Sequence, residues 1–140
     1  MRGGDFLDSN VLLYLFDSTD PAKRHAAESL VQSAVATGAG AISVQVAQET
    51  LNVLTRGITP AASADECRRF MNDVLAPLWR VMPTQALYER ALDIHARYRY
   101  AFYDALIVAA AISAGCSRLL SEDLQHGQRI EGLTIQNPFV

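Results

Sequence analysis

The sequence contains few of the residues on which cysteine, lysine and histidine sites depend. Its two cysteines, Cys67 and Cys116, form no C-x-x-C pair, so neither a disulfide framework nor a cysteine zinc site is expected. The single lysine, Lys23, lies in DPAKRH without neighbouring glycines, which excludes a phosphate-binding loop of the type G-x-x-x-x-G-K-[ST]. The three histidines are scattered and show no H-E-x-x-H spacing, so a histidine zinc site is not expected. A G-x-S-x-G motif for a nucleophilic serine is also missing.

Long apolar runs are missing as well. The longest spans residues 105–112, far short of the about 20 residues that a membrane-spanning helix needs. Near the start of the chain, Asp5 and Asp8 interrupt what would be the apolar part of a signal peptide. We therefore expect a cytoplasmic protein without a membrane partner.

The composition is that of one folded domain. The 140 residues are 50% hydrophobic and 19% charged, which favours a single domain spanning residues 1–140 and argues against disorder. The formal net charge is −3, and taken alone this value speaks mildly against a nucleic acid as partner.

Short apolar strands and helices alternate along the chain. Strands are expected at residues 4–8, 40–44, 79–82, 117–121 and 133–136. Helices are expected at residues 11–16, 22–38, 46–57, 63–75, 84–97 and 104–115. This alternation predicts an α/β fold, a three-layer α/β/α sandwich with a mainly parallel central sheet. In such folds the binding crevice lies at the carboxyl ends of the strands.

Local signals predict where several of these helices begin or end. Ser9 or Asn10 is expected to cap the first helix, and Gly38 is expected to end the second. Ser63 opens a capping box, and Thr84 is expected to cap the helix that follows Pro83.

Two aspartates follow predicted strands. Asp8 comes directly after Phe6 and Leu7, and Asp123 follows the late strand that ends near Ser121. Each is either a helix cap or turn residue, or a site carboxylate at the edge of the crevice. Two strand ends that deliver an aspartate into one crevice are harder to explain as two caps. Glu122 is adjacent, and the sequence leaves open which of the two acids faces inward.

Two further acids belong to predicted helices. Glu49 shares a helical face with Val46 and Val53, so it either needs a partner or a metal there, or reaches solvent from the edge of that apolar stripe. Asp104 starts the very apolar stretch DALIVAAAISAG. It either caps this helix or contributes to a polar site at the inner edge of the core.

Four acids without lysine or histidine among them suit a hard divalent cation. Carboxylate oxygens hold Mg²⁺ or Mn²⁺, usually with waters retained. Such a site can activate water and stabilise an in-line displacement at phosphorus.

The motifs, taken together, resemble a known family. They are FLDSNVLLY at 6–14, the mid-helix Glu49, FYDALIVAAA at 102–111, and LLSEDLQHGQRIEGLTIQNPF at 119–139. In this order they resemble the PIN domain family, and most closely the VapC-type toxins of bacterial toxin–antitoxin pairs. Residues 57–83 match no motif, and the choice of RNA is expected to reside there.

The resemblance implies roles for individual residues. Asp8, Glu49, Asp104 and Asp123 would form the acidic quartet that binds the metal, with Asn10 and Ser121 in support. It further implies a Mg²⁺- or Mn²⁺-dependent endoribonuclease that cuts structured RNAs involved in translation. Such toxins are silenced by a cognate antitoxin and commonly form homodimers.

The net charge no longer argues against RNA as a partner once the four acids of the quartet are left out of the count. Removing four negative charges turns the formal net charge from −3 into +1, so the acidity does not exclude RNA. Arg97 and Arg99 alternate with Tyr98 and Tyr100, a pattern that suits contact with phosphates and bases. The alternative is a helix end whose aromatic rings lie in the core.

Two other functions stay open from the sequence. One is a housekeeping RNA-processing PIN nuclease, which a neighbouring reading frame for an antitoxin would distinguish from a toxin. The other is a non-catalytic PIN-like protein-binding module, against which the intact quartet argues.

Overall fold

The computed structural model describes residues 3–56 and 62–140. Its strands are β1 (Asp5–Leu7), β2 (Ile42–Ser43), β3 (Trp79–Val81), β4 (Arg118–Leu120), β5 (Arg129–Ile130) and β6 (Leu133–Gln136). Four of them form a sheet in the order β1-β4-β6-β5, with β1, β4 and β6 parallel and β5 antiparallel to β6. The parallel pair β2–β3 continues beside β1 through a bridge between Phe6 and Ala41. The predicted, mainly parallel sheet is therefore confirmed, while β5 was not expected.

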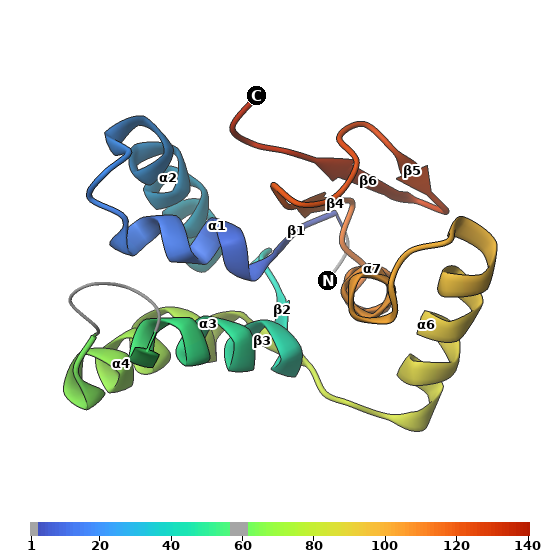
Figure 1. Cartoon of the computed structure of the whole chain (residues 1–140), viewed down its shortest axis with the longest axis horizontal. Helices are drawn as coiled ribbons and strands as arrows, with labels where there is room; N and C mark the ends of the chain where they lie inside the picture. Colours follow the sequence, from blue (N-terminus) through green and yellow to red (C-terminus); the bar gives the residue numbers. More distant parts are fainter. Residues whose placement is uncertain (1–2, 57–61) are drawn as a thin grey trace.

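The helices cover this sheet on both sides. They are α1 (Ser9–Leu13), the 3₁₀ turn η1 (Tyr14–Phe16), α2 (Pro21–Thr37), α3 (Val44–Arg56), α4 (Ala64–Phe70), the π-helical turn η2 (Met71–Leu75), α5 (Ala76–Leu78), α6 (Gln85–Tyr98) and α7 (Phe102–Ser113). In Figure 1, α1 and α2 lie on one side of β1, and α6 and α7 lie on the other. This is the predicted three-layer arrangement. None of the described helices combines the length and apolar character needed to cross a membrane.

Several predicted helix ends are confirmed. Gly38 adopts a left-handed conformation with φ 68° and ends α2. Ser63 and Glu66 form the predicted capping box at α4, and the Thr84 side chain caps α6. The helix end predicted at Gly57 lies outside the described residues.

Two predicted helix starts are wrong. The first helix is capped by Asp8 rather than by Ser9 or Asn10, because the Asp8 carboxylate accepts a hydrogen bond from the free backbone N–H of Ser9. The helix α7 begins at Phe102 after Ala101, so Asp104 belongs to its first turn and does not cap it. Both differences move an acid relative to its helix and bear on the site.

The core fixes β1 and α7, the elements that carry two of the acids. Residues 105–111 of α7 are all buried, as the apolar sequence predicts. The Arg118 guanidinium of β4 donates two hydrogen bonds of 2.7 Å to the Asp5 carboxylate of β1. A Cβ atom at Gly4 would stand 1.5 Å from the carbonyl oxygen of Ala39, so only glycine fits where β1 begins. These contacts hold the amino ends of β1 and β4 together, and the parallel pairing places their carboxyl ends, Leu7 and Leu120, side by side.

Candidate functional site

Asp8 lies at the carboxyl end of β1 and is both a helix cap and a buried acid. Its side chain is 7% exposed. One oxygen accepts a hydrogen bond from the backbone N–H of Ser9 at 2.8 Å, and the other accepts one from the Ser121 hydroxyl at 2.8 Å. The two alternatives for this residue, cap and site carboxylate, are thus compatible.

Asn10 and Ser121 connect Asp8 to Asp123. The Asn10 Nδ2 donates to Oδ2 of Asp123 at 3.1 Å and to Oδ2 of Asp8 at 3.4 Å. The Asn10 Oδ1 accepts from the backbone N–H of Glu122 at 3.0 Å, which orients the amide with its nitrogen toward the acids. The Ser121 hydroxyl accepts from the backbone N–H of Asp123 at 3.2 Å. The structure thus places both predicted supporting residues between two acids of the quartet.

Glu49 reaches the same cluster from α3. It lies at the edge of the buried stripe that includes Val46, and its side chain is half-buried. Its carboxylate accepts hydrogen bonds from the Ser9 hydroxyl at 3.3 Å and from Gln45 Nε2 at 3.2 Å. The edge of the stripe supplies the polar partners that a carboxylate in this position requires.

Asp104 projects from the first turn of α7 and is half-buried. Burial raises its pKa above the ordinary value, and the negative charge of Asp123 raises it further. An acid in the first turn is stabilised by the positive end of the helix dipole, which opposes part of this cost.

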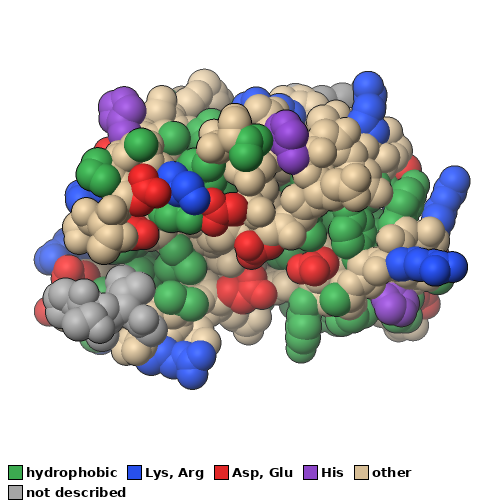
Figure 2. Space-filling model, turned by 45° about the horizontal axis from the view of Figure 1, so that its top comes forward, with side chains coloured by type: hydrophobic (Ala, Val, Ile, Leu, Met, Phe, Trp, Pro, Cys, Tyr) green, Lys and Arg blue, Asp and Glu red, His purple; other side chains and the backbone are tan. Residues whose placement is uncertain are grey.

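The buried position of Asp8 has a strong electrostatic consequence. Burial raises its pKa from 3.8 to about 6, and the charges of Glu49 and Asp123 add to this rise, while hydrogen bonds from Ser121 and Ser9 oppose it. Asp8 therefore interacts with Glu49 and Asp123, and Asp123 with Asp104. Figure 2 shows acidic side chains gathered across the middle of this face of the molecule.

Glu122 faces away from the quartet. Its carboxylate accepts hydrogen bonds of 2.6 Å from the Tyr14 hydroxyl and from the ammonium of Lys23, which together lower its pKa. The ammonium also lies 5.6 Å from the ring centre of Phe139. The sequence left open whether Glu122 or Asp123 faces inward, and the structure selects Asp123. The pairing of Glu122 with Lys23, the only lysine of the chain, was not predicted, because the two residues lie 99 positions apart.

The chemistry of the cluster fits a hard divalent cation. Its donors are carboxylate oxygens, and within the described residues none of the four acids forms an ion pair, unlike Asp5, Glu122 and Glu131. The arrangement is open: in the described part of the chain, no three side chains of His, Cys, Asp or Glu are close enough to hold one ion as they stand. Since the Asn10 amide bridges Asp8 and Asp123, side-chain rotation is needed to bring the acids around an ion.

The two arginines predicted to contact RNA lie beside tyrosines. The Arg97 guanidinium lies 5.6 Å from the ring centre of Tyr98, and Arg99 is the left-handed residue that ends α6. Tyr98 and Tyr100 are half-buried, and Tyr100 hydrogen bonds to Gln128. Both rings pack against the core without being fully buried, which is closer to the alternative of a helix end with its aromatic rings in the core, and RNA contact by Arg97 and Arg99 stays a prediction.

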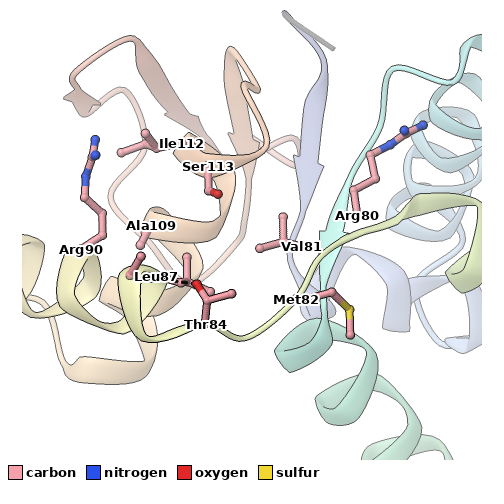
Figure 3. Close-up of a pocket in the computed structure, with 10 residues that line it drawn as sticks. Arg80, Val81, Met82, Thr84, Leu87, Arg90, Ala109, Ile112 and Ser113 are labelled. Carbon is pink, nitrogen blue, oxygen red and sulfur yellow. Dashed lines mark hydrogen bonds between the residues drawn. The ribbon is translucent and has the colours of Figure 1, made fainter.

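A cavity of about 460 Å³ lies apart from the acids, between the end of β3, the start of α6 and the second half of α7 (Figure 3). Arg80 and Arg90 stand at its opposite ends. The Arg80 guanidinium donates to the carbonyl oxygens of Gly40 and Gly38, at 2.8 and 2.7 Å, and Arg90 is paired with Glu131. Both cations are therefore already engaged, and none of the four acids lines this cavity.

Solved structures share this fold at low sequence identity. The Mycobacterium tuberculosis toxin VapC20, described as cleaving the sarcin-ricin loop, matches with TM-score 0.64 and 23% identity over 86% of this chain and 92% of its own. A toxin–antitoxin complex from Klebsiella pneumoniae matches with TM-score 0.65 and 19% identity over 96% and 98% of the two chains. VapBC2 from Rickettsia felis, bound to a DNA fragment from its promoter, matches with TM-score 0.58 and 16% identity over 95% and 97%.

The sequence also matches a family as a whole. No curated protein matches the chain significantly. The family model of the PIN domain, however, matches residues 6–129, from the first strand to the start of β5, and this range includes all four acids. The chain belongs to the PIN domain family.

Proposed function

We propose that the protein is a metal-dependent endoribonuclease and the toxin of a toxin–antitoxin pair. The observation that carries this proposal is the convergence of four acids without an ion-pair partner in the described residues, at the carboxyl ends of β1 and β4. Membership of the PIN family supports the nuclease activity. The toxin role is supported by the shared fold with the Klebsiella and Mycobacterium proteins, and a cognate antitoxin and a second copy of this chain are the proposed protein partners.

Asp8, Glu49, Asp104 and Asp123 are the proposed ligands of Mg²⁺ or Mn²⁺. When bound, the ion would supply Lewis-acid chemistry that polarises a water and a phosphate oxygen. The chain's own residues position these acids. Asn10 and Ser121 hold Asp8 next to Asp123, while Ser9 and Gln45 hold Glu49.

Expression of the chain alone in bacterial cells tests the activity. We expect new RNA ends carrying 5′-phosphate and 3′-hydroxyl groups, because a water activated by the bound ion would attack phosphorus directly and needs no 2′-hydroxyl nucleophile. Asp8→Asn should abolish these ends. Asp73→Asn is the matched control, since it makes the same chemical change at an exposed position of η2. The measurement is sequencing of RNA ends that separates the two end chemistries.

Other outcomes of this experiment decide between the open functions. Ends with 2′,3′-cyclic phosphate, or equal cleavage by Asp8→Asn, would contradict the proposed chemistry. Identical RNA ends with and without expression would favour the protein-binding module. Cleavage without growth arrest, or arrest that no neighbouring small reading frame relieves, would favour the housekeeping nuclease.

Lys23 is expected to influence cleavage from outside the quartet. Lys23→Met removes the ion pair that holds the Glu122 side chain and with it the loop that carries Asp123. We expect cleavage to slow about ten-fold, because small displacements of a site residue are costly. The melting temperature should change little, since a partly exposed pair adds little stability.

Lys23→Arg is the control, because it restores a cation next to Glu122. We expect it to recover most of the cleavage rate, measured on one RNA at saturating substrate. If Lys23→Met and Lys23→Arg cleave as fast as the wild type, the ion pair does not position Asp123.

A further inference from the structure

A cavity of about 240 Å³ opens beside the acidic cluster. It lies between α3, the end of β3 and the first turns of α6 and α7. Its walls include Ser43, Gln45, Gln48, Tyr88, Tyr103 and Leu106. The volume is roughly eight times the about 30 Å³ that a water molecule occupies in the liquid. A single heteroaromatic ring system fits such a space.

Gln45 lies between the cavity and the acids. Gln45 lies one helical turn before Glu49, and its Nε2 donates to the Glu49 carboxylate at 3.2 Å. The same Nε2 donates to the backbone carbonyl of Tyr103 at 3.2 Å, and Tyr103 directly precedes Asp104. A group bound in this cavity is therefore separated from Glu49 by the Gln45 side chain and contacts Tyr103, the residue next to Asp104.

Gln45 also presents an unused acceptor. Both partners of its nitrogen are acceptors, which fixes the orientation of the amide and leaves Oε1 on the other side. This oxygen is buried and has no hydrogen-bond partner in the described residues. A buried acceptor without a partner is unfavourable, and a shift of the Gln45 side chain that lets this oxygen accept from an N–H donor of a bound group removes that cost. Every RNA base carries such a donor on its Watson–Crick edge.

Aromatic rings and the lack of charge point to the same kind of ligand. Tyr103 is 68% exposed and Tyr88 is 41% exposed, so both offer ring surface to a stacked base. No charged side chain is among the described residues that line the cavity, so it offers a phosphate no cation to pair with. The cavity in Figure 3, by contrast, is flanked by arginines that are already engaged.

We propose that this cavity is a base subsite, which takes one unpaired base of the RNA next to the bond that is cut. The inference rests on the proposed nuclease function and adds a source of sequence preference to it. The exposed tyrosines stack on the base, and the amides of Gln45 and Gln48 contact its edge. Stacking and the N–H donor are common to all four bases, so selection of one base at a fixed position relative to the cleavage point comes from the second amide, that of Gln48.

Cleavage of a random-sequence RNA pool, followed by sequencing of the products, tests the subsite. For the wild type we expect about ten-fold enrichment of one base at one position next to the cut, the size of one well-made hydrogen bond. Tyr103→Ala and Gln48→Ala should lose this enrichment while still cutting the pool. Tyr103→Phe should keep it, because the ring is retained. Gln45 is left unchanged, since its amide also supports Glu49.

Leu92→Ala is the matched control on the same face of the molecule. Leu92 is an exposed apolar residue of α6 that does not line the cavity, so the preference should persist. Enrichment that survives in both Tyr103→Ala and Gln48→Ala, or a wild type that cuts with no preference, overturns the subsite. If Leu92→Ala loses the base preference and also forms a smaller oligomer by light scattering, the base subsite is overturned, and this surface of α6 instead binds a second copy of the chain. A wild type that cuts none of the pool contradicts the nuclease function itself.

Discussion

Asp8→Asn is expected to lose cleavage and, in the absence of metal at neutral pH, to melt at a higher temperature than the wild type. The loss of activity should be about a thousand-fold or more, as for other residues that act within one catalytic unit. The gain in stability follows from the environment of the charge. Asp8 is buried beside Glu49 and Asp123, and these three carboxylates destabilise one another.

The pKa of Asp8 sets the size and the pH range of this effect. It is about 6 in the folded protein against an ordinary value of 3.8. Because the folded state holds the proton more tightly than the unfolded state, its free energy of unfolding falls as the pH rises from about 4 to about 6. Two pKa units correspond to about 3 kcal/mol. The side-chain amide introduced by Asp8→Asn loses some of the hydrogen bonding to Ser9 and Ser121. We therefore expect a net gain of about 1–2 kcal/mol in the free energy of unfolding, or a few degrees in melting temperature.

Melting curves with a chelator, recorded between about pH 4 and pH 8, measure this effect. The wild type should lose stability relative to Asp8→Asn as the pH rises, and the two proteins should converge at the acidic end. Asp73→Asn, the exposed control, should follow the wild type throughout. A wild type that melts above Asp8→Asn at neutral pH without metal would mean that the hydrogen bonds outweigh the buried charge.

The parts of the fold that the sequence predicted are those encoded locally. Gly38, Ser63 and Thr84 act on the backbone within a few residues, and each begins or ends a helix as predicted. The burial of residues 105–111 followed from their apolar character alone. The strand β5 was not predicted, because two residues carry no recognisable period and their pairing depends on the tight turn at Glu131, which has φ 57°.

The sequence predicted which acids form the site, but not the hydrogen bonds and ion pairs that hold them. Asp8 and Asp123 follow strands, and parallel neighbours bring their carboxyl ends together. The contacts of Asn10 with Asp123 and of Lys23 with Glu122 join residues 113 and 99 positions apart, and sequence patterns carry no information about such pairs. Asp104 was misplaced by two residues relative to its helix, because Phe102 and Tyr103 already belong to α7.

Addition of Mg²⁺ or Mn²⁺ is expected to raise the melting temperature of the wild type. A ligand that binds only the folded state stabilises it by mass action, by about 2.7 kcal/mol at one hundred times its dissociation constant. The open arrangement of the acids means that the ion must also replace the bridging amide of Asn10, which reduces the gain. Burial raises the pKa values of Asp8 and Asp104, and neighbouring acids raise them further; a bound cation relieves the part that comes from repulsion between the acids.

Asp104→Asn separates these two contributions. It removes one proposed ligand and one half-buried charge whose pKa is raised by burial and by Asp123. Without metal it should melt at or above the wild type, and with metal it should gain clearly less. Melting series with chelator, Mg²⁺ and Mn²⁺ on the wild type, Asp104→Asn and Asp73→Asn measure both effects. If saturating metal shifts the wild type and Asp104→Asn equally, Asp104 is not a ligand. If it shifts none of the three proteins, the four acids do not form a shared metal site, and the proposed nuclease chemistry loses its physical basis.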